Sequence, residues 1–172
     1  MKLLLVLLFS AGILLAQSED LERLNFLIGN WKGNGEGFGN SKSVISASYS
    51  STMNDKFIEV VNESHFEPTE KNPDGEHHID RGFISFDNAR GKIVYRQFNI
   101  EGYVNQYLLN ESLSNQNTFV FETENIENFV PGGKARYTIK KLSDTSLETI
   151  FDVSFPGKEY ACFGTNRLTK LK

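Results

Sequence analysis

From Trp31 onward the chain alternates between hydrophobic and polar residues, a pattern typical of strands with one buried face. In the segment 146–155, for example, Leu147 and Phe151 share one parity, whereas Glu148 falls on the other. Residues 131–133, Pro-Gly-Gly, form the clearest turn, because proline presets φ and glycine accepts a positive φ. The pattern predicts about ten strands, at 31–38, 42–53, 56–66, 77–86, 92–100, 103–113, 118–126, 134–142, 146–155 and 159–168.

The order of these segments predicts the fold class. No long helical stretch separates consecutive strands, which excludes parallel βαβ units. Strands that follow one another through short turns pair as hairpins, and closing the series into a barrel removes exposed edges. We therefore expect an all-β protein, an antiparallel up-and-down barrel of about ten strands.

One segment departs from the strand pattern. Within residues 20–28, Leu21, Leu24 and Leu27 are spaced as on one face of a helix. Asp20 is a suitable N-cap, and Gly29 is a suitable end. We expect one short N-terminal helix that covers the barrel mouth or plugs one end.

The first sixteen residues have the layout of a secretory signal peptide. Lys2 precedes an almost unbroken apolar run over residues 3–15, and Ala16 then precedes a polar stretch. We expect residues 1–16 to be cleaved, leaving 17–172 as a single β-barrel domain without an integral membrane segment. The protein would then be exported, to a bacterial periplasm or beyond the cell. The alternative is an uncleaved membrane anchor, although the apolar run is short for a span.

Composition and charge exclude some classes of function and of structural stabilisation. The formal net charge of −4 argues against nucleic acid, whose binding requires a basic surface. Cys162 is the only cysteine, so no intramolecular disulfide can form and the domain depends on its core. The residue is interpreted as a small buried hydrophobe or, alternatively, as a reactive thiol.

Several polar residues fall on strand faces that are otherwise hydrophobic. Asn105, Tyr107 and Tyr137 share parity with apolar neighbours, and polar atoms on such a face need partners, which a ligand could supply. Arg96 shares parity with Val94 and two further hydrophobic residues. If that parity faces inward, Arg96 would pair with an anionic ligand group. The alternative is that it faces solvent or an internal carboxylate.

The chain has three histidines, His65, His77 and His78. A hairpin would bring His65 close to His77 or His78, which point to opposite faces of their strand, and carboxylates such as Glu76 lie nearby, which permits a surface metal site. The alternative is a solvated loop rim. The sequence contains no nucleophile elbow, phosphate-binding loop or zinc-protease helix, so it favours a binding protein over an enzyme.

The opening of the first strand resembles known barrel families. Gly29-x-Trp31 is similar to the lipocalin signature, in which the tryptophan packs across the closed end of a calycin barrel. Its continuation, Gly33-x-Gly35-x-Gly37, resembles the nitrobindins and a related bacterial family of unknown function. Alternate glycines let a strand bend or let another backbone approach closely.

The resemblance to nitrobindins implies haem binding, and some members of that family are assigned peroxynitrite isomerisation. Nitrobindins hold haem through a histidine on the last strand, and the segment 159–168 contains none. His65, His78 and Cys162 are the remaining candidate haem or metal ligands.

Three functions follow. The first is an exported barrel that binds a small hydrophobic or amphipathic ligand in its lumen, through Arg96, Asn105, Tyr107 and Tyr137. The second is a haem-binding, nitrobindin-like protein. The third is a structural barrel whose lumen is filled by its own side chains, since the chain contains 14 phenylalanines.

Overall fold

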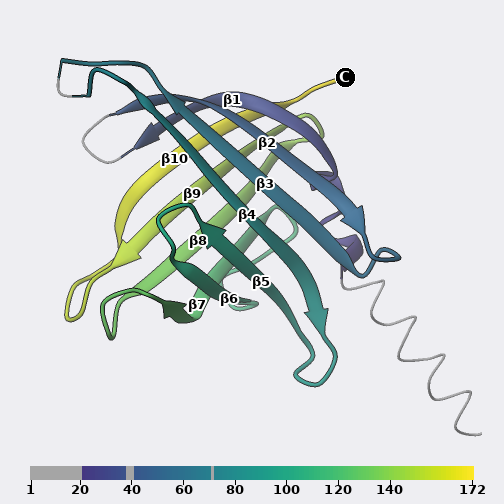
Figure 1. Ribbon diagram of the computed structural model, residues 1–172. Coiled ribbons are helices and arrows are strands. Elements are labelled where there is room, and N and C mark those ends of the chain that lie inside the picture. Colours follow the sequence, from purple (N-terminus) through teal and green to yellow (C-terminus); the bar gives the residue numbers. More distant parts are fainter. Residues whose placement is uncertain (1–20, 38–40, 71) are drawn as a thin grey trace, which may run out of the picture.

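Ten antiparallel strands of the computed structural model close into an up-and-down barrel (Figure 1). Each strand pairs with its neighbours along the chain, and β1 closes the ring against β10. The structure describes residues 21–37, 41–70 and 72–172. The strands are β1 (Gly29–Gly37), β2 (Lys42–Thr52), β3 (Phe57–Phe66), β4 (Glu76–Asp87), β5 (Lys92–Asn99), β6 (Val104–Leu109), β7 (Thr118–Glu127), β8 (Lys134–Ser143), β9 (Ser146–Ser154) and β10 (Ala161–Lys170).

The all-β barrel predicted from the sequence is therefore confirmed. Burial alternates along the strands as a period of two requires, and one face of each strand lines the interior. The core contains Trp31, Tyr49, Tyr95 and Phe121, which are almost completely buried, together with aliphatic side chains. Closure leaves no sheet edge for another chain to extend.

The predicted N-terminal helix is, in its described part, a 3-10 turn over Asn25–Leu27. Successive i to i−3 hydrogen bonds wind the segment tightly, as when the Leu27 amide donates to the Leu24 carbonyl oxygen at 3.0 Å. Leu21, Leu24 and Leu27 are buried in the core. The proposed cap at residue 20 and the expected leader at 1–16 lie outside the described residues.

Trp31 ties this turn to the barrel. Its Nε1 donates to the Leu27 carbonyl oxygen at 2.7 Å, and the Lys170 ammonium lies 5.2 Å from the centre of its ring. The Lys170 ammonium also donates to the Phe26 carbonyl oxygen at 3.1 Å. Gly29 begins β1 with φ of 132°, a value that side chains rarely allow. The turn thus seals the barrel at the end where β1 begins.

The alternate glycines of β1 allow close packing against neighbouring elements. Gly33 pairs with Leu168 of β10, and a Cβ at Gly33 would overlap the Arg167 carbonyl oxygen. A Cβ at Gly35 would meet the side chains of Asn166 and other residues inside the barrel. In the described ranges, no helix has the length and apolar character required to cross a membrane.

Candidate ligand-binding site at the open end of the barrel

The barrel interior opens at the end opposite the N-terminal turn. A cavity of about 580 Å³ lies there, within the size range of small-molecule sites. Its walls come from the ends of odd-numbered strands, the starts of even-numbered strands and the turns between them. The lumen is therefore plugged at one end and hollow at the other. This hollow counts against the filled-lumen interpretation.

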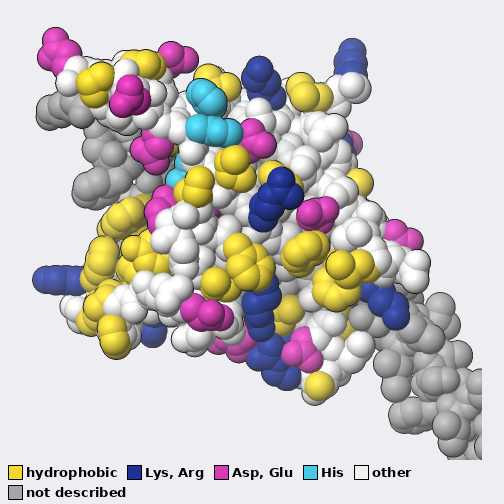
Figure 2. Space-filling view, in the orientation of Figure 1, with side chains coloured by type: hydrophobic (Ala, Val, Ile, Leu, Met, Phe, Trp, Pro, Cys, Tyr) yellow, Lys and Arg dark blue, Asp and Glu magenta, His cyan; other side chains and the backbone are white. Residues whose placement is uncertain are grey.

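One wall of the mouth is aromatic. Tyr103, which precedes β6, contacts Phe129 after β7 with ring centres 5.5 Å apart. Phe129 contacts Phe155 at 5.6 Å, and Phe155 contacts Phe163 of β10 at 6.3 Å. Figure 2 shows hydrophobic side chains gathered at this end of the barrel, with histidine and acidic side chains above them. The four rings form a continuous apolar surface for a ligand body.

The other wall is acidic and centres on His78. This residue lies between Glu76 and Asp80 on the inward face of β4, and Glu101 approaches from the β5–β6 turn. His78 Nδ1 is 2.8 Å from Glu101 and 3.8 Å from Glu76, while Nε2 is 3.1 Å from Asp80. The hydrogen bond to Asp80 is the main cause that raises the pKa of His78, and burial partly opposes it.

The acidic wall continues into a polar network deeper in the barrel. The Gln97 amide donates to Asp80 at 3.3 Å, and the Gln97 oxygen accepts from Asn105 at 3.4 Å and from the Tyr107 hydroxyl at 3.2 Å. Burial raises the pKa of Tyr107 well above its ordinary value. These neutral groups connect the charged rim to the buried floor.

A cluster of four buried tyrosines lies deeper in the barrel, and of these Tyr137 lines the cavity. Tyr95 stacks on Tyr107 with ring centres 5.5 Å apart, and Tyr137 lies 5.8 Å from Tyr95. Burial raises the pKa of Tyr95, Tyr49 and Tyr137 as well. The buried Tyr95 hydroxyl has no hydrogen-bond partner among the described residues. Gly82 makes room for this ring, since a Cβ there would lie 2.8 Å from it.

The predicted lumen residues separate into two groups. Asn105 and Tyr137 line the cavity, and Tyr107 lies on the same inward face. Arg96 does not line it, and the sequence-based placement of this residue is corrected. In β5 the buried Tyr95 and Gln97 occupy the inward parity, so Arg96 points outward.

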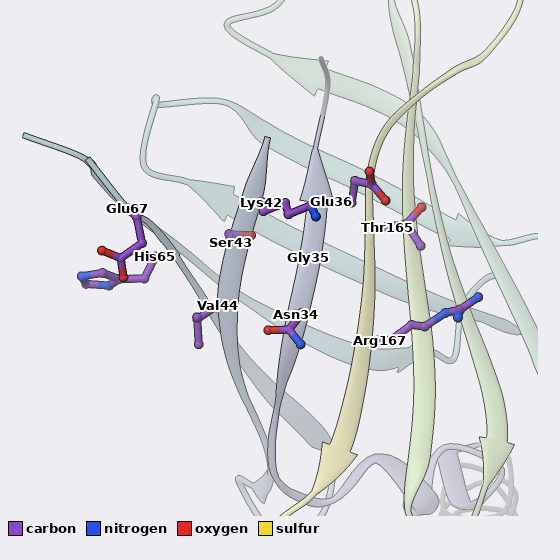
Figure 3. Close-up of a pocket in the computed structure, with 10 residues that line it drawn as sticks. All are labelled: Asn34, Gly35, Glu36, Lys42, Ser43, Val44, His65, Glu67, Thr165 and Arg167. Carbon is purple, nitrogen blue, oxygen red and sulfur yellow. The ribbon is translucent and has the colours of Figure 1, made fainter. Parts of the chain in front are cut away.

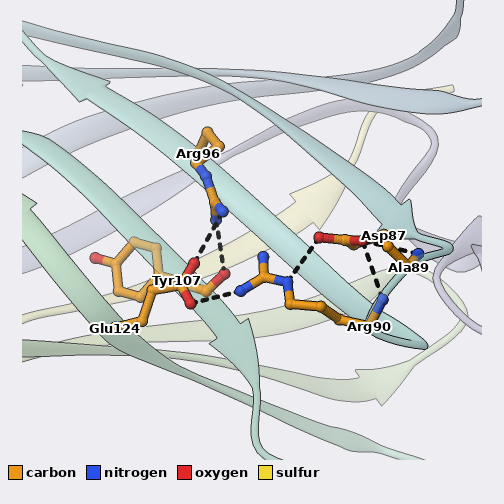
Figure 4. A network of polar contacts seen from close by, with 6 residues as sticks. All are labelled: Asp87, Ala89, Arg90, Arg96, Tyr107 and Glu124. Atoms are coloured by element: carbon orange, nitrogen blue, oxygen red, sulfur yellow. Dashed lines mark hydrogen bonds and ion pairs between the residues drawn. The ribbon is translucent and has the colours of Figure 1, made fainter.

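Figure 4 shows where the Arg96 side chain lies instead. Its guanidinium donates to Glu124 at 2.9 Å and to the Tyr107 carbonyl oxygen at 3.1 Å. Glu124 also accepts from Arg90 at 2.7 Å, and Arg90 donates to Asp87 at the same distance. Arg96 thus belongs to an outer-face ion-pair network, which corresponds to the alternative in which it faces solvent.

Two of the three histidines lie on the outer face. His65 and His77 have ring centres 4.8 Å apart, and His77 contacts Glu63 at 3.3 Å. Cys162 is exposed rather than buried, and its sulfur lies 3.5 Å from the Thr165 hydroxyl. Of the candidate haem or metal ligands, only His78 faces the lumen.

The lumen residues fit haem poorly. Both ring nitrogens of His78 contact carboxylates, with Asp80 and Glu101 at 3.1 Å and 2.8 Å. Haem carries two propionates, which these carboxylates would repel. In the described residues, Glu76, His78 and Glu101 each offer one possible metal-ligand atom, and these atoms lie within 4.8 Å of one another.

A second depression lies on the outer face over β1, β2, β3 and β10 (Figure 3). Glu36 and Lys42 project near its centre, and Glu67 and Arg167 stand at opposite sides. Its lining mixes both signs of charge and has no aromatic surface comparable with that of the mouth. We therefore place the candidate site in the lumen.

The comparisons with known proteins support the fold alone. No protein-family model and no curated protein matches the sequence. The structure is similar to the crystal structure of Rv2717c from M. tuberculosis, with a TM-score of 0.63 and 14% identity over 88% of this chain and 97% of that chain. A redesigned β-barrel matches with a TM-score of 0.41 and 12% identity over 86% of this chain and 93% of its own.

The sequence did not reveal the acidic wall, although part of its signal was present. Glu76, His78 and Asp80 alternate along one strand face, as residues at i, i+2 and i+4 do. Glu101 joins them only through the β4–β5 hairpin, in which Asp80 pairs with Asn99. That register could not be read from the sequence pattern.

Proposed function

We propose that this protein binds a small amphipathic molecule in the lumen of its barrel. The observation that carries the proposal is a cavity of about 580 Å³ with one aromatic wall and one charged wall. A purely apolar ligand would leave the acidic groups without compensation, while a purely polar one would leave the rings exposed. We also propose that residues 1–16 direct export, so that binding takes place outside the cytoplasm.

The polar floor supports the same proposal. Asn105, Tyr137 and Thr149 present hydrogen-bonding groups to the cavity. A ligand that carries polar atoms at its inner end would find hydrogen-bonding groups there.

The test is a titration with Nile red, a neutral, environment-sensitive dye whose aromatic body carries a carbonyl oxygen and a dialkylamino group. Ser64 lies on the cavity wall of β3, so Ser64→Trp should fill part of the cavity. Ser46, on the exposed face of β2, provides the matched control Ser46→Trp. We expect dye emission to rise on binding, and Ser64→Trp to weaken affinity by roughly tenfold, about 1.4 kcal/mol, without effect from the control.

Failure of the unmodified protein to bind Nile red would contradict the proposal. Equal affinity in Ser64→Trp and Ser46→Trp would also contradict it, because the dye would then occupy a surface other than the lumen. Circular dichroism of both variants checks that the barrel remains folded.

A further inference from the structure

The charges around the cavity have one predominant sign. Three residues on the inward side of the mouth carry carboxylates that line it, Glu76, Asp80 and Glu101, whereas the Glu36 side chain lies on the outer face of β1. Within the described parts of the chain, no lysine or arginine lines it. Arg96, a lumen candidate in the sequence, is held on the outer face by Glu124. An anionic ligand would therefore find no cationic side chain to pair with.

His78 is the one lining residue able to carry positive charge, and it is already engaged. Its imidazole faces Glu76 and Asp80 from its own strand and Glu101 from the following turn. Even as imidazolium it offsets one of these three carboxylates, which leaves two net negative charges around the mouth. The Asp80 side chain is 16% exposed, so solvent and salt screen its charge least.

The aromatic wall is suited to the same ligand charge. Ring faces attract cations, and the rings of Tyr103, Phe129, Phe155 and Phe163 also provide apolar contact area. A ligand with an apolar body and a cationic group could contact the rings and the carboxylates together. The rings would then contact the apolar body of the ligand, and the carboxylates would contact its cationic group.

From these observations we infer that the lumen selects an amphipathic cation, a small organic amine with an apolar body, over neutral or anionic amphiphiles. This inference rests on the proposed function and specifies the chemistry of its ligand. Fatty acids and haem, both of which carry carboxylates, are disfavoured by the same residues.

The experiment compares three probes that share one alkyl chain. Decylamine, decanol and decanoate each displace Nile red below their aggregation concentrations, at neutral pH and with EDTA present to exclude metal ions. Decylamine is protonated under these conditions, as a lysine side chain is. We expect decylamine to bind about tenfold more tightly than decanol, and decanoate to bind most weakly. The preference for decylamine should shrink as salt is added.

Variants test which carboxylates cause the preference for decylamine over decanol. Glu76→Gln combined with Glu101→Gln removes two partly exposed charges at the rim and should reduce the ratio of decylamine to decanol affinity by about fivefold or more. Glu63→Gln removes a carboxylate that contacts His77 on the outer face and should leave the ratio unchanged. The affinity for decanol reports whether the cavity itself survives in each variant.

The possible outcomes distinguish a failure of the inferred cation selectivity from a failure of the proposed function. Equal affinities for the three probes, or a preference for decanoate, would overturn cation selection while leaving the lumen as a binding site. A decylamine preference that survives in the double variant would overturn the assignment to these carboxylates. Absence of binding by Nile red and by every probe would instead contradict the proposed function.

Discussion

His78 is surrounded by carboxylates at the mouth of the barrel. Nδ1 approaches Glu101 at 2.8 Å, and Nε2 approaches Asp80 at 3.1 Å. Both ring nitrogens must carry a proton to donate to both carboxylates, so the imidazolium satisfies the geometry best. The contact with Asp80 is the leading cause of the raised pKa of His78.

This contact predicts how stability depends on pH. Because the folded pKa of His78 is raised, its contribution is complete below the unfolded pKa of about 6.5 and is lost as pH rises through the folded pKa. Urea midpoints of the unmodified protein should therefore decline over that window relative to those of His78→Gln. His77→Gln, which removes an exposed imidazole, is the matched control. Parallel pH profiles for the unmodified protein and His78→Gln would contradict this prediction.

Single residues also show where the sequence was sufficient to predict which side chains face the barrel interior. On β8 one parity is apolar and the other is largely charged, so the inward placement of Tyr137 could be predicted. On β5 both parities contain hydrophobic residues, with Val94 on one and Tyr95 on the other. Periodicity alone could not choose between them. Pairing with β4 and β6 fixes the choice and places Arg96 outside.

At the scale of elements, β1 and β10 depend on the glycine motif at the start of the barrel. Residues 29–37 pack so closely against β10 that a Cβ at Gly33 would overlap the Arg167 carbonyl oxygen. Gly164, the partner of Gly37, has much more space, since its nearest neighbour would be 4.0 Å from a Cβ. The glycines therefore differ in what they contribute to the fold.

The difference gives a paired prediction for stability. Gly33→Ala must displace backbone of β10 and should lower the free energy of unfolding by about 3 kcal/mol. Gly164→Ala requires no such displacement and should change it by less than about 1 kcal/mol. Urea unfolding followed by circular dichroism measures both. Similar losses in the two variants would show that the close approach at Gly33 is not the cause.

The elements were largely predictable, and their ends were less so. The strand expected at 103–113 ends at Leu109, because the Asn110 side-chain oxygen accepts hydrogen bonds from the amides of Ser112 and Leu113 and forms a turn. The segment expected to be a helix tightens into a 3-10 turn, where Trp31 bonds the Leu27 carbonyl oxygen. Both differences arise from side-chain to backbone bonds that periodicity does not encode.

At the scale of the whole molecule, the barrel has two unlike ends. The N-terminal turn and Trp31 seal one end with buried leucines. At the other end, segments far apart in the sequence form an aromatic wall and an acidic wall. Odd-numbered strands all run toward the open end, so the up-and-down topology by itself gathers these residues into one mouth (Figure 1). The order of the strands could be predicted from the sequence. The two walls, in contrast, come together only because the strands close into a ring.

The most direct test of this account is a solution NMR titration of the ¹⁵N-labelled protein with decylamine. We predict that amide shifts concentrate at the open end, at Gly37, Phe129 and Gly164, while the Trp31 indole signal at the sealed end is unchanged. Shifts centred on Val44 and His65 would place the ligand in the outer depression and contradict lumen binding. The absence of any shift would contradict the account altogether.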